Sequence, residues 1–78
     1  MDALQEIRGG IEAHVGAKVW MKNHRGRSRS IETIGILEHS FPSVFTVLVE
    51  HNGVQKRMSY TYSDVFTKHV EMKWLETK

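Results

Sequence analysis

The chain has 78 residues, of which 40% are hydrophobic and 26% charged, with one proline and no cysteine. This composition is typical of an ordinary folded domain, and the length predicts one small domain over residues 1–78 with little room for an enclosed active-site cleft. The absence of cysteine excludes disulfides and thiolate zinc sites, which favours a cytoplasmic location. Acidic residues interrupt the apolar residues at the start of the chain, so we expect no signal peptide, no membrane span and no membrane partner.

The formal net charge of +2 is distributed unevenly. Residues 1–17 hold one basic and three acidic side chains (−2), residues 18–31 hold five basic and none acidic (+5), and residues 32–78 hold five basic and six acidic (−1). The positive charge is therefore concentrated in one segment, which includes the stretch HRGRSRS. Such clustering is expected both for an electrostatic contact surface and for a well-solvated loop, and it leaves both interpretations open.

The first element that the sequence predicts is an amphipathic helix over roughly residues 2–14. Its apolar residues recur at spacings of three and four: Leu4, Ile7, Ile11 and Val15. The pair Gly9-Gly10 weakens this helix, because each glycine costs about 0.5–1 kcal/mol relative to alanine. The helix therefore needs a tertiary partner, and Gly16 is placed to end it.

From residue 17 the apolar period changes from helical to alternating. Val19 and Met21 fall on one side of a predicted strand at 17–23, and the other side carries Lys18, Trp20 and Lys22. A second strand is predicted at 30–40, where the interior Gly35 suggests a bulge or a sharp bend.

The remaining elements are predicted from turn residues and period-two patterns. They are a turn at 41–43, a third and central strand at 43–50, a hairpin turn at Asn52-Gly53, a fourth strand at 54–62, a helical turn at 63–67 capped by Ser63, and a fifth strand at 69–75.

This order predicts a mainly β fold. Five short antiparallel strands avoid exposed edges by curling into a barrel, and a glycine bend in the second strand would allow the curvature. We therefore expect a small five-stranded SH3-like (Sm-like) barrel over residues 17–78, preceded by one N-terminal α-helix within residues 1–16. The helix would cover the barrel and bury Leu4, Ile7 and Ile11.

Catalytic and metal-binding motifs are missing from the sequence. The five histidines stand far apart, without the spacing of a metal site: His14, His24, His39, His51 and His69. Asp64, His69 and a serine make a weak triad candidate, because no serine lies on a glycine-flanked elbow. We expect no enzyme activity, no catalytic residue, no bound metal and no cofactor.

The sequence favours a binding surface as the functional feature. Most of the aromatic residues of so small a chain are needed for the core, but Trp20 shares the polar side of its strand with lysines, as at contact surfaces. The predicted surface consists of Lys18, Trp20, Lys22, Arg25, Arg27 and Arg29.

Two separated motifs carry a family resemblance. The stretches GRSRSIETIGILEHSFPSVFTV and RMSYTYSDVFTKHVEM resemble the Veg family of small proteins from Gram-positive bacteria. The shared pattern is a basic loop, a G-x-L segment at 35–37, a turn at 42–45 and a Y-x-Y-x-D segment with Tyr60, Tyr62 and Asp64. The resemblance implies a cytoplasmic, non-enzymatic SH3-like barrel that stimulates biofilm formation by influencing transcription, and it brings no binding-site residues with it.

Two mechanisms stay open at this point. In the first, the domain binds a regulatory protein through its arginine and aromatic residues. In the second, it binds RNA or DNA directly and neutralises phosphates with its basic segment. The small net charge argues mildly against a dedicated nucleic-acid binder. An exposed strand at a sheet edge would also suit a homodimer.

Overall fold

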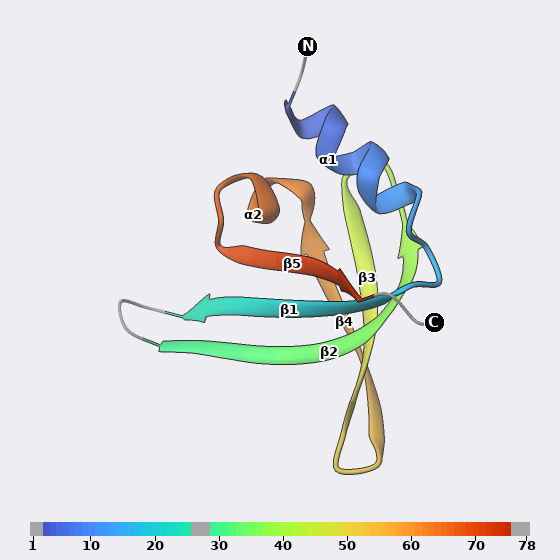
Figure 1. Cartoon of the computed structure of the whole chain (residues 1–78), viewed down its shortest axis with the longest axis vertical. Helices are drawn as coiled ribbons and strands as arrows, with labels where there is room; N and C mark the ends of the chain where they lie inside the picture. Colours follow the sequence, from blue (N-terminus) through green and yellow to red (C-terminus); the bar gives the residue numbers. More distant parts are fainter. Residues whose placement is uncertain (1–2, 26–28, 76–78) are drawn as a thin grey trace.

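The computed structural model describes residues 3–25 and 29–75. In chain order the elements are α1 (Ala3–Glu12), β1 (Lys18–Arg25), β2 (Arg29–Ser40), β3 (Val44–His51), β4 (Val54–Thr61), α2 (Tyr62–Phe66) and β5 (Val70–Leu75), as Figure 1 shows. The predicted order of helix, four strands, helical turn and fifth strand is therefore confirmed.

The five strands form one antiparallel sheet in the order β4-β3-β2-β1-β5. The sheet is open, with β4 and β5 as its two edges, so the predicted closed barrel is not confirmed. The register explains why. β1 pairs with the first part of β2, up to Ile36, whereas β3 pairs with the second part, from Gly35 onward. The β1–β2 and β3–β4 hairpins consequently point in different directions (Figure 1).

The bend of β2 has two local causes. The pairing with β3 shifts register between Leu37 and His39, which is the irregularity of a bulge. Gly35 lies where β3 comes closest, because a Cβ there would be 2.6 Å from the carbonyl oxygen of Leu48. The sequence correctly singles out Gly35 as a special position of the second strand. In the structure Gly35 allows the close approach of β3, and the register shift lies between Leu37 and His39.

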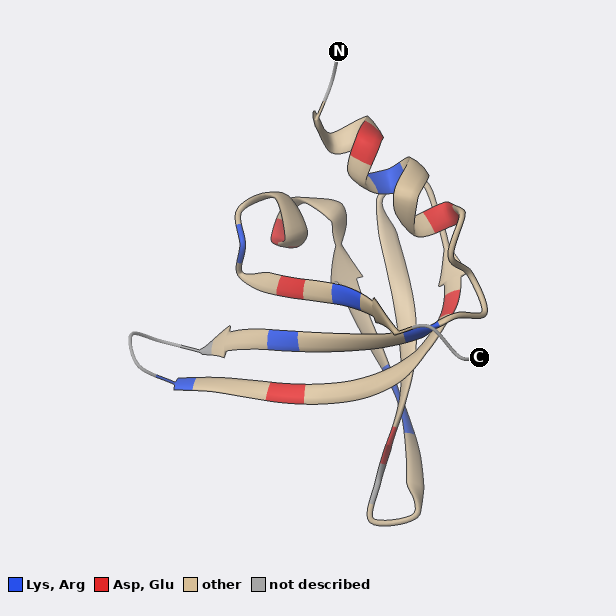
Figure 2. Cartoon of the chain, viewed as in Figure 1, with Lys and Arg blue, Asp and Glu red and all other residues tan. Residues whose placement is uncertain are grey.

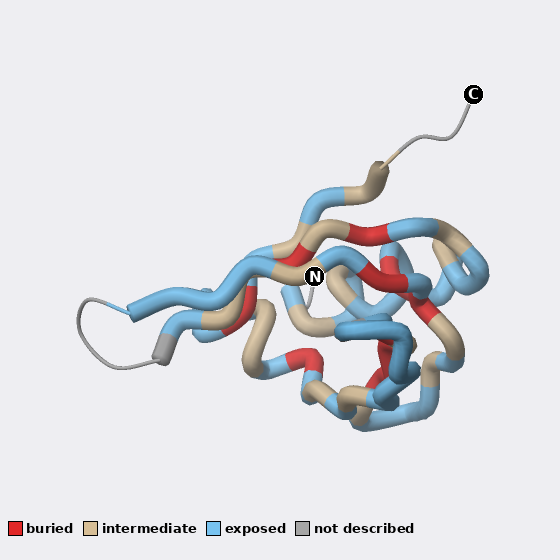
Figure 3. The backbone as a smooth tube through the Cα atoms, turned by 90° about the horizontal axis from the view of Figure 1, so that it is seen from below, coloured by how far each residue is buried: buried red, intermediate tan, exposed pale blue. Residues whose placement is uncertain are grey.

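The core lies on one face of the sheet, where residues of α1 and α2 pack against it. Figure 3 shows the buried residues as red segments along the chain. The buried apolar residues are Ile11, Val19, Met21, Leu37, Phe45, Val47, Val49, Tyr62 and Val70. Leu4 and Ile7 are half-buried and pack against this core, which confirms the predicted helix face, whereas Val15 is exposed. We call this side of the sheet the core face and the opposite side the outer face.

The connection from α1 to β1 is fixed by two contacts. The imidazole of His14 stacks on the indole of Trp74, with centroids 4.1 Å apart and planes inclined by 2°. Gly16 has φ of +94°, and its N–H donates to the carbonyl of Leu37 (2.8 Å). The helix ends at Glu12, so Gly16 turns the chain into β1 rather than capping the helix directly.

The short helix α2 is capped by Thr61, not by Ser63 as predicted. The Thr61 hydroxyl accepts a bond from the Asp64 N–H, and the Asp64 carboxylate accepts one from the Thr61 N–H, both at 3.1 Å. This reciprocal capping box places the cap two residues earlier than expected, and the helix begins at Tyr62 rather than at Ser63. The buried Tyr62 hydroxyl donates to the carbonyl of Phe41 at 2.6 Å, and its burial raises the pKa of that hydroxyl.

Candidate binding surface

The predicted alternation of β1 is confirmed. Val19 and Met21 are buried in the core, so Lys18, Trp20 and Lys22 lie on the outer face. Trp20 is half-buried rather than fully exposed. Its neighbours on both adjacent strands account for this partial burial.

Trp20 lies between an aliphatic and a basic neighbour. Directly opposite it are Ile34 on β2 and Lys73 on β5. The Lys73 ammonium is 5.9 Å from the centroid of the Trp20 ring, within the range of a cation–π contact. The Trp20 indole Nε1–H donates to the Glu32 carboxylate at 3.1 Å. This bond fixes the orientation of the ring and satisfies its one polar atom.

Carboxylates surround the basic part of this face. Lys22 stands opposite Glu32 on β2 and opposite Glu71 on β5, and Figure 2 shows these charges along the three strands. Glu71 bonds the His24 ring at 2.6 Å, which lowers the pKa of Glu71; nearby Lys22 and Lys68 contribute in the same direction. Residues 18–31 include no acidic residue, but the fold places Glu32 and Glu71 beside Lys22.

Arg29 does not continue this surface as predicted. Arg29 has the same strand parity as Thr33 and Gly35, so it belongs to the core-face side of β2, opposite to Trp20. Arg25 ends β1 and pairs with Arg29 in the ladder. Arg27 lies outside the described residues. Among the predicted residues whose side chains are described, Lys18, Trp20 and Lys22 lie on the outer face and Arg29 does not.

The outer face gains apolar residues that the sequence analysis missed. Ile34 and Ile36 have 54% and 43% of their surface exposed. Ile34 lines a shallow hollow of about 440 Å³ together with Trp20 and Glu50. The period-two pattern of residues 30–40 contained this signal, because Ile34 and Ile36 alternate with the buried Gly35 and Leu37. We call the set Lys18, Trp20, Lys22, Ile34, Ile36 and Lys73 the tryptophan surface.

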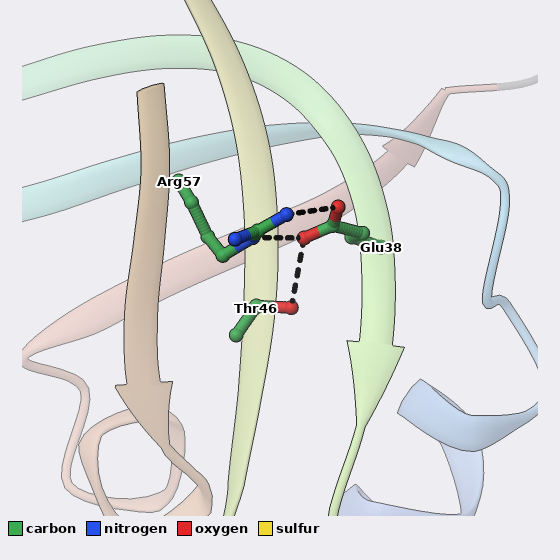
Figure 4. A network of polar contacts seen from close by, with 3 residues as sticks. All are labelled: Glu38, Thr46 and Arg57. Carbon is green, nitrogen blue, oxygen red and sulfur yellow. Dashed lines mark hydrogen bonds and ion pairs between the residues drawn. The ribbon is translucent and has the colours of Figure 1, made fainter. Parts of the chain in front are cut away.

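A second polar group lies on the outer face, over β2, β3 and β4 (Figure 4). Arg57 forms a bidentate pair with Glu38, at 2.6 Å from Nε and 2.9 Å from Nη2, and the Thr46 hydroxyl donates to the same carboxylate at 3.3 Å. The bonds from Arg57 lower the pKa of Glu38, mainly through hydrogen bonding. The guanidinium of Arg57 is therefore matched within the chain and belongs to the framework of the sheet.

The structure offers few sites for other chemistry. In residues 3–25 and 29–75, no group of three or more histidine or acidic side chains is placed to hold a metal ion. Neither helix in the described part of the chain is long and apolar enough to cross a membrane.

Comparison with known families agrees with the sequence motifs. A family model described as "Biofilm formation stimulator VEG" matches residues 2–73, nearly the whole chain. No curated protein matches the chain. The matched region contains α1, the first four strands, α2 and most of β5. On this evidence the chain belongs to the Veg family of biofilm formation stimulators.

Proposed function

We propose that this protein stimulates biofilm formation as a non-enzymatic, cytoplasmic protein that binds a regulator of transcription through the tryptophan surface. Family membership supports the biofilm role. The composition of the tryptophan surface supports a protein as the partner. Family membership and this composition together favour the mechanism in which the domain binds a regulatory protein.

One observation carries the choice of partner, namely the mixture of side chains around Trp20. Exposed isoleucines lie on one side of the ring, and charges of both signs surround it: Lys18, Lys22 and Lys73 against Glu32 and Glu71. Protein interfaces combine an aromatic anchor with aliphatic neighbours and a polar rim. A phosphate-binding track is instead dominated by lysine and arginine, whose positive charge neutralises phosphates and is weakened by nearby carboxylates.

The alternative is direct binding of RNA or DNA. The arginine-rich connection between β1 and β2 favours it, because four or five phosphate contacts would fit the basic residues of segment 18–31. Such binding should weaken with salt, with a log–log slope of about −3 to −4.5. A titration against generic RNA and duplex DNA tests this directly. Tight binding with that slope would overturn the protein-partner proposal in favour of the alternative.

The protein-partner proposal is tested by capture from the native cytoplasm. We expect Ile34→Glu to lose the proteins that wild type retains, because it places a charge beside Trp20. The variant should still fold, since Ile34 is exposed. Phe66→Glu is a matched control, since Phe66 is also exposed but lies on α2, outside the tryptophan surface.

Both variants should be expressed in cells that lack the wild-type protein, and biofilm mass measured. We expect Ile34→Glu to lower biofilm mass and Phe66→Glu to preserve it. Equal capture and equal biofilm formation by the two variants would show that the tryptophan surface is not the contact.

A further inference from the structure

The edge strand β4 and the space beside it form a second feature, on the opposite face of the sheet from the tryptophan surface. β4 is an edge of the sheet, and its first four residues are exposed on both faces. Val54, at its start, has 66% of its surface exposed. A strand with this exposure and one free edge has the properties of a pairing site for another strand.

The turn before β4 determines which backbone groups point to the free edge. Asn52 and Gly53 have φ of 54° and 78°, as in a two-residue type I′ turn. In such a turn the flanking residues, here His51 and Val54, are a hydrogen-bonded pair, and bonded pairs then alternate along the ladder. The N–H and C=O groups of Gln55, Arg57 and Ser59 are therefore directed away from β3.

An apolar cleft lies on the core-face side of the same strand. Its volume is about 180 Å³, and Met58 and Tyr60 of β4 line one wall while Ile31 of β2 lines the other. Ile31 retains 48% exposure. The cleft thus lies between the two diverging hairpins, where closure of the sheet would have filled it. A strand added to β4 would direct alternate side chains into this space.

The charges beside the cleft are of one sign. Among the described residues that line it, only Lys56 is charged, and Arg29 lies on the same side of β2 as Ile31. β4 itself carries Lys56 and Arg57 but no acid. Antiparallel pairing of two β4 strands would bring these basic residues together, which disfavours a second copy as the occupant.

We propose that the β4 edge binds an extended segment of a partner protein by strand addition, with alternate apolar side chains in the cleft and an acidic side chain beside Lys56. Backbone hydrogen bonds would supply affinity and the cleft would supply selectivity. Because this site shares no residue with the tryptophan surface, the proposal stands or fails independently of the proposed function.

The test uses the full chain and a capped eight-residue peptide. Every second residue of the peptide is threonine, and the four residues between them are three valines and one glutamate. We expect binding to protect the amides of Gln55, Arg57 and Ser59 from hydrogen exchange. Two N-methylated versions of the peptide are matched controls. In one, the backbone amides of the odd-numbered residues are methylated, and in the other those of the even-numbered residues. Strand addition predicts that one version loses binding and the other keeps it.

The charge requirement is tested with Lys56→Glu, whose fold is checked by thermal unfolding. This variant should bind the glutamate peptide about two- to fivefold more weakly than wild type, and a peptide with lysine in place of glutamate correspondingly more tightly. Equal binding of both methylated peptides, unchanged charge preference, or no binding at millimolar concentration would overturn the proposal. Sedimentation as a dimer that Ser59→Pro dissociates would also overturn it, by identifying a second copy as the occupant.

Discussion

At the scale of single residues, Gly35 and Glu38 both constrain the sheet. They lie close together on β2, but Gly35 acts through steric fit and Glu38 through hydrogen bonds and charge. Gly35 is needed because β3 leaves no space for a side chain. Glu38 joins three strands on the outer face through its bonds to Arg57 and Thr46.

Gly35→Ala should destabilise the protein. The added Cβ would lie 2.6 Å from the Leu48 carbonyl oxygen and 2.8 Å from methyl groups of Val47 and Val49, so the backbone must shift. Overpacking of this kind costs about 1–3 kcal/mol, measurable by urea unfolding. Gly9→Ala is the control, because nothing lies within 4 Å of its Cβ position and the helix gains about 0.5–1 kcal/mol. An equal gain at both positions would contradict the close approach.

Glu38 should make stability depend on acidic pH. Its pKa is lowered below the ordinary value of 4.5, so the carboxylate stabilises the fold above pH 4.5, and this contribution is lost as the pH falls through the lowered folded value. Free energies of unfolding of wild type and Glu38→Gln should therefore differ at pH 7 and converge in acid. Glu50→Gln serves as control, since Glu50 has no ion pair with another described residue. A difference that persists unchanged at low pH would exclude this linkage.

At the scale of elements, local signals located most of the secondary structure. The apolar spacing of α1, the alternation of β1 and the Asn52-Gly53 turn are properties of neighbouring residues, and each is confirmed. The start of α2 was placed wrongly because Thr61 and Ser63 are both good caps in sequence. The geometry that selects Thr61, its reciprocal bonds with Asp64, is visible only in the structure.

Thr61→Ala should lower stability by about 1 kcal/mol, because the N–H of Asp64 loses its partner at the start of α2. Ser63→Ala should change stability little, since alanine is tolerated inside a helix. Thermal unfolding of the two variants distinguishes the caps. A larger loss at Ser63 than at Thr61 would restore the sequence-based assignment.

At the scale of the whole molecule, the shape of the sheet and the neighbours of Trp20 were beyond sequence reasoning. Closure of a barrel depends on the angle at which β2 passes from one hairpin to the other, and this angle is set by the pairing of β2 with β3, which the residues of β2 alone do not reveal. Lys73 and Glu71 reach the tryptophan surface through a register between strands about fifty residues apart in sequence. The alternation along β1 correctly placed Lys18, Trp20 and Lys22 on one face. It could not predict that Glu32 and Glu71 would lie beside them, because those carboxylates come from the neighbouring strands.

The two helices and the sheet should unfold together. Ile11, 3% exposed, connects α1 to the core, and Ile11→Ala should cost about 2–5 kcal/mol through lost burial and the cavity left behind. Helical circular dichroism and tryptophan fluorescence should report the same urea midpoint, lowered equally in the variant. Loss of the helical signal before the tryptophan signal would mean that α1 is an independent appendage.

The stack of His14 on Trp74 also bears on biosynthesis. The ring that holds the end of α1 lies 60 positions further along the chain (74 − 14), and β1 obtains its second neighbour only from residues 70–75. A nascent chain with four strands outside the ribosome therefore has one side of β1 unpaired and lacks the stack that holds the segment after α1. Native folding is completed only once β5 has emerged, so its last step follows the synthesis of residues 70–75.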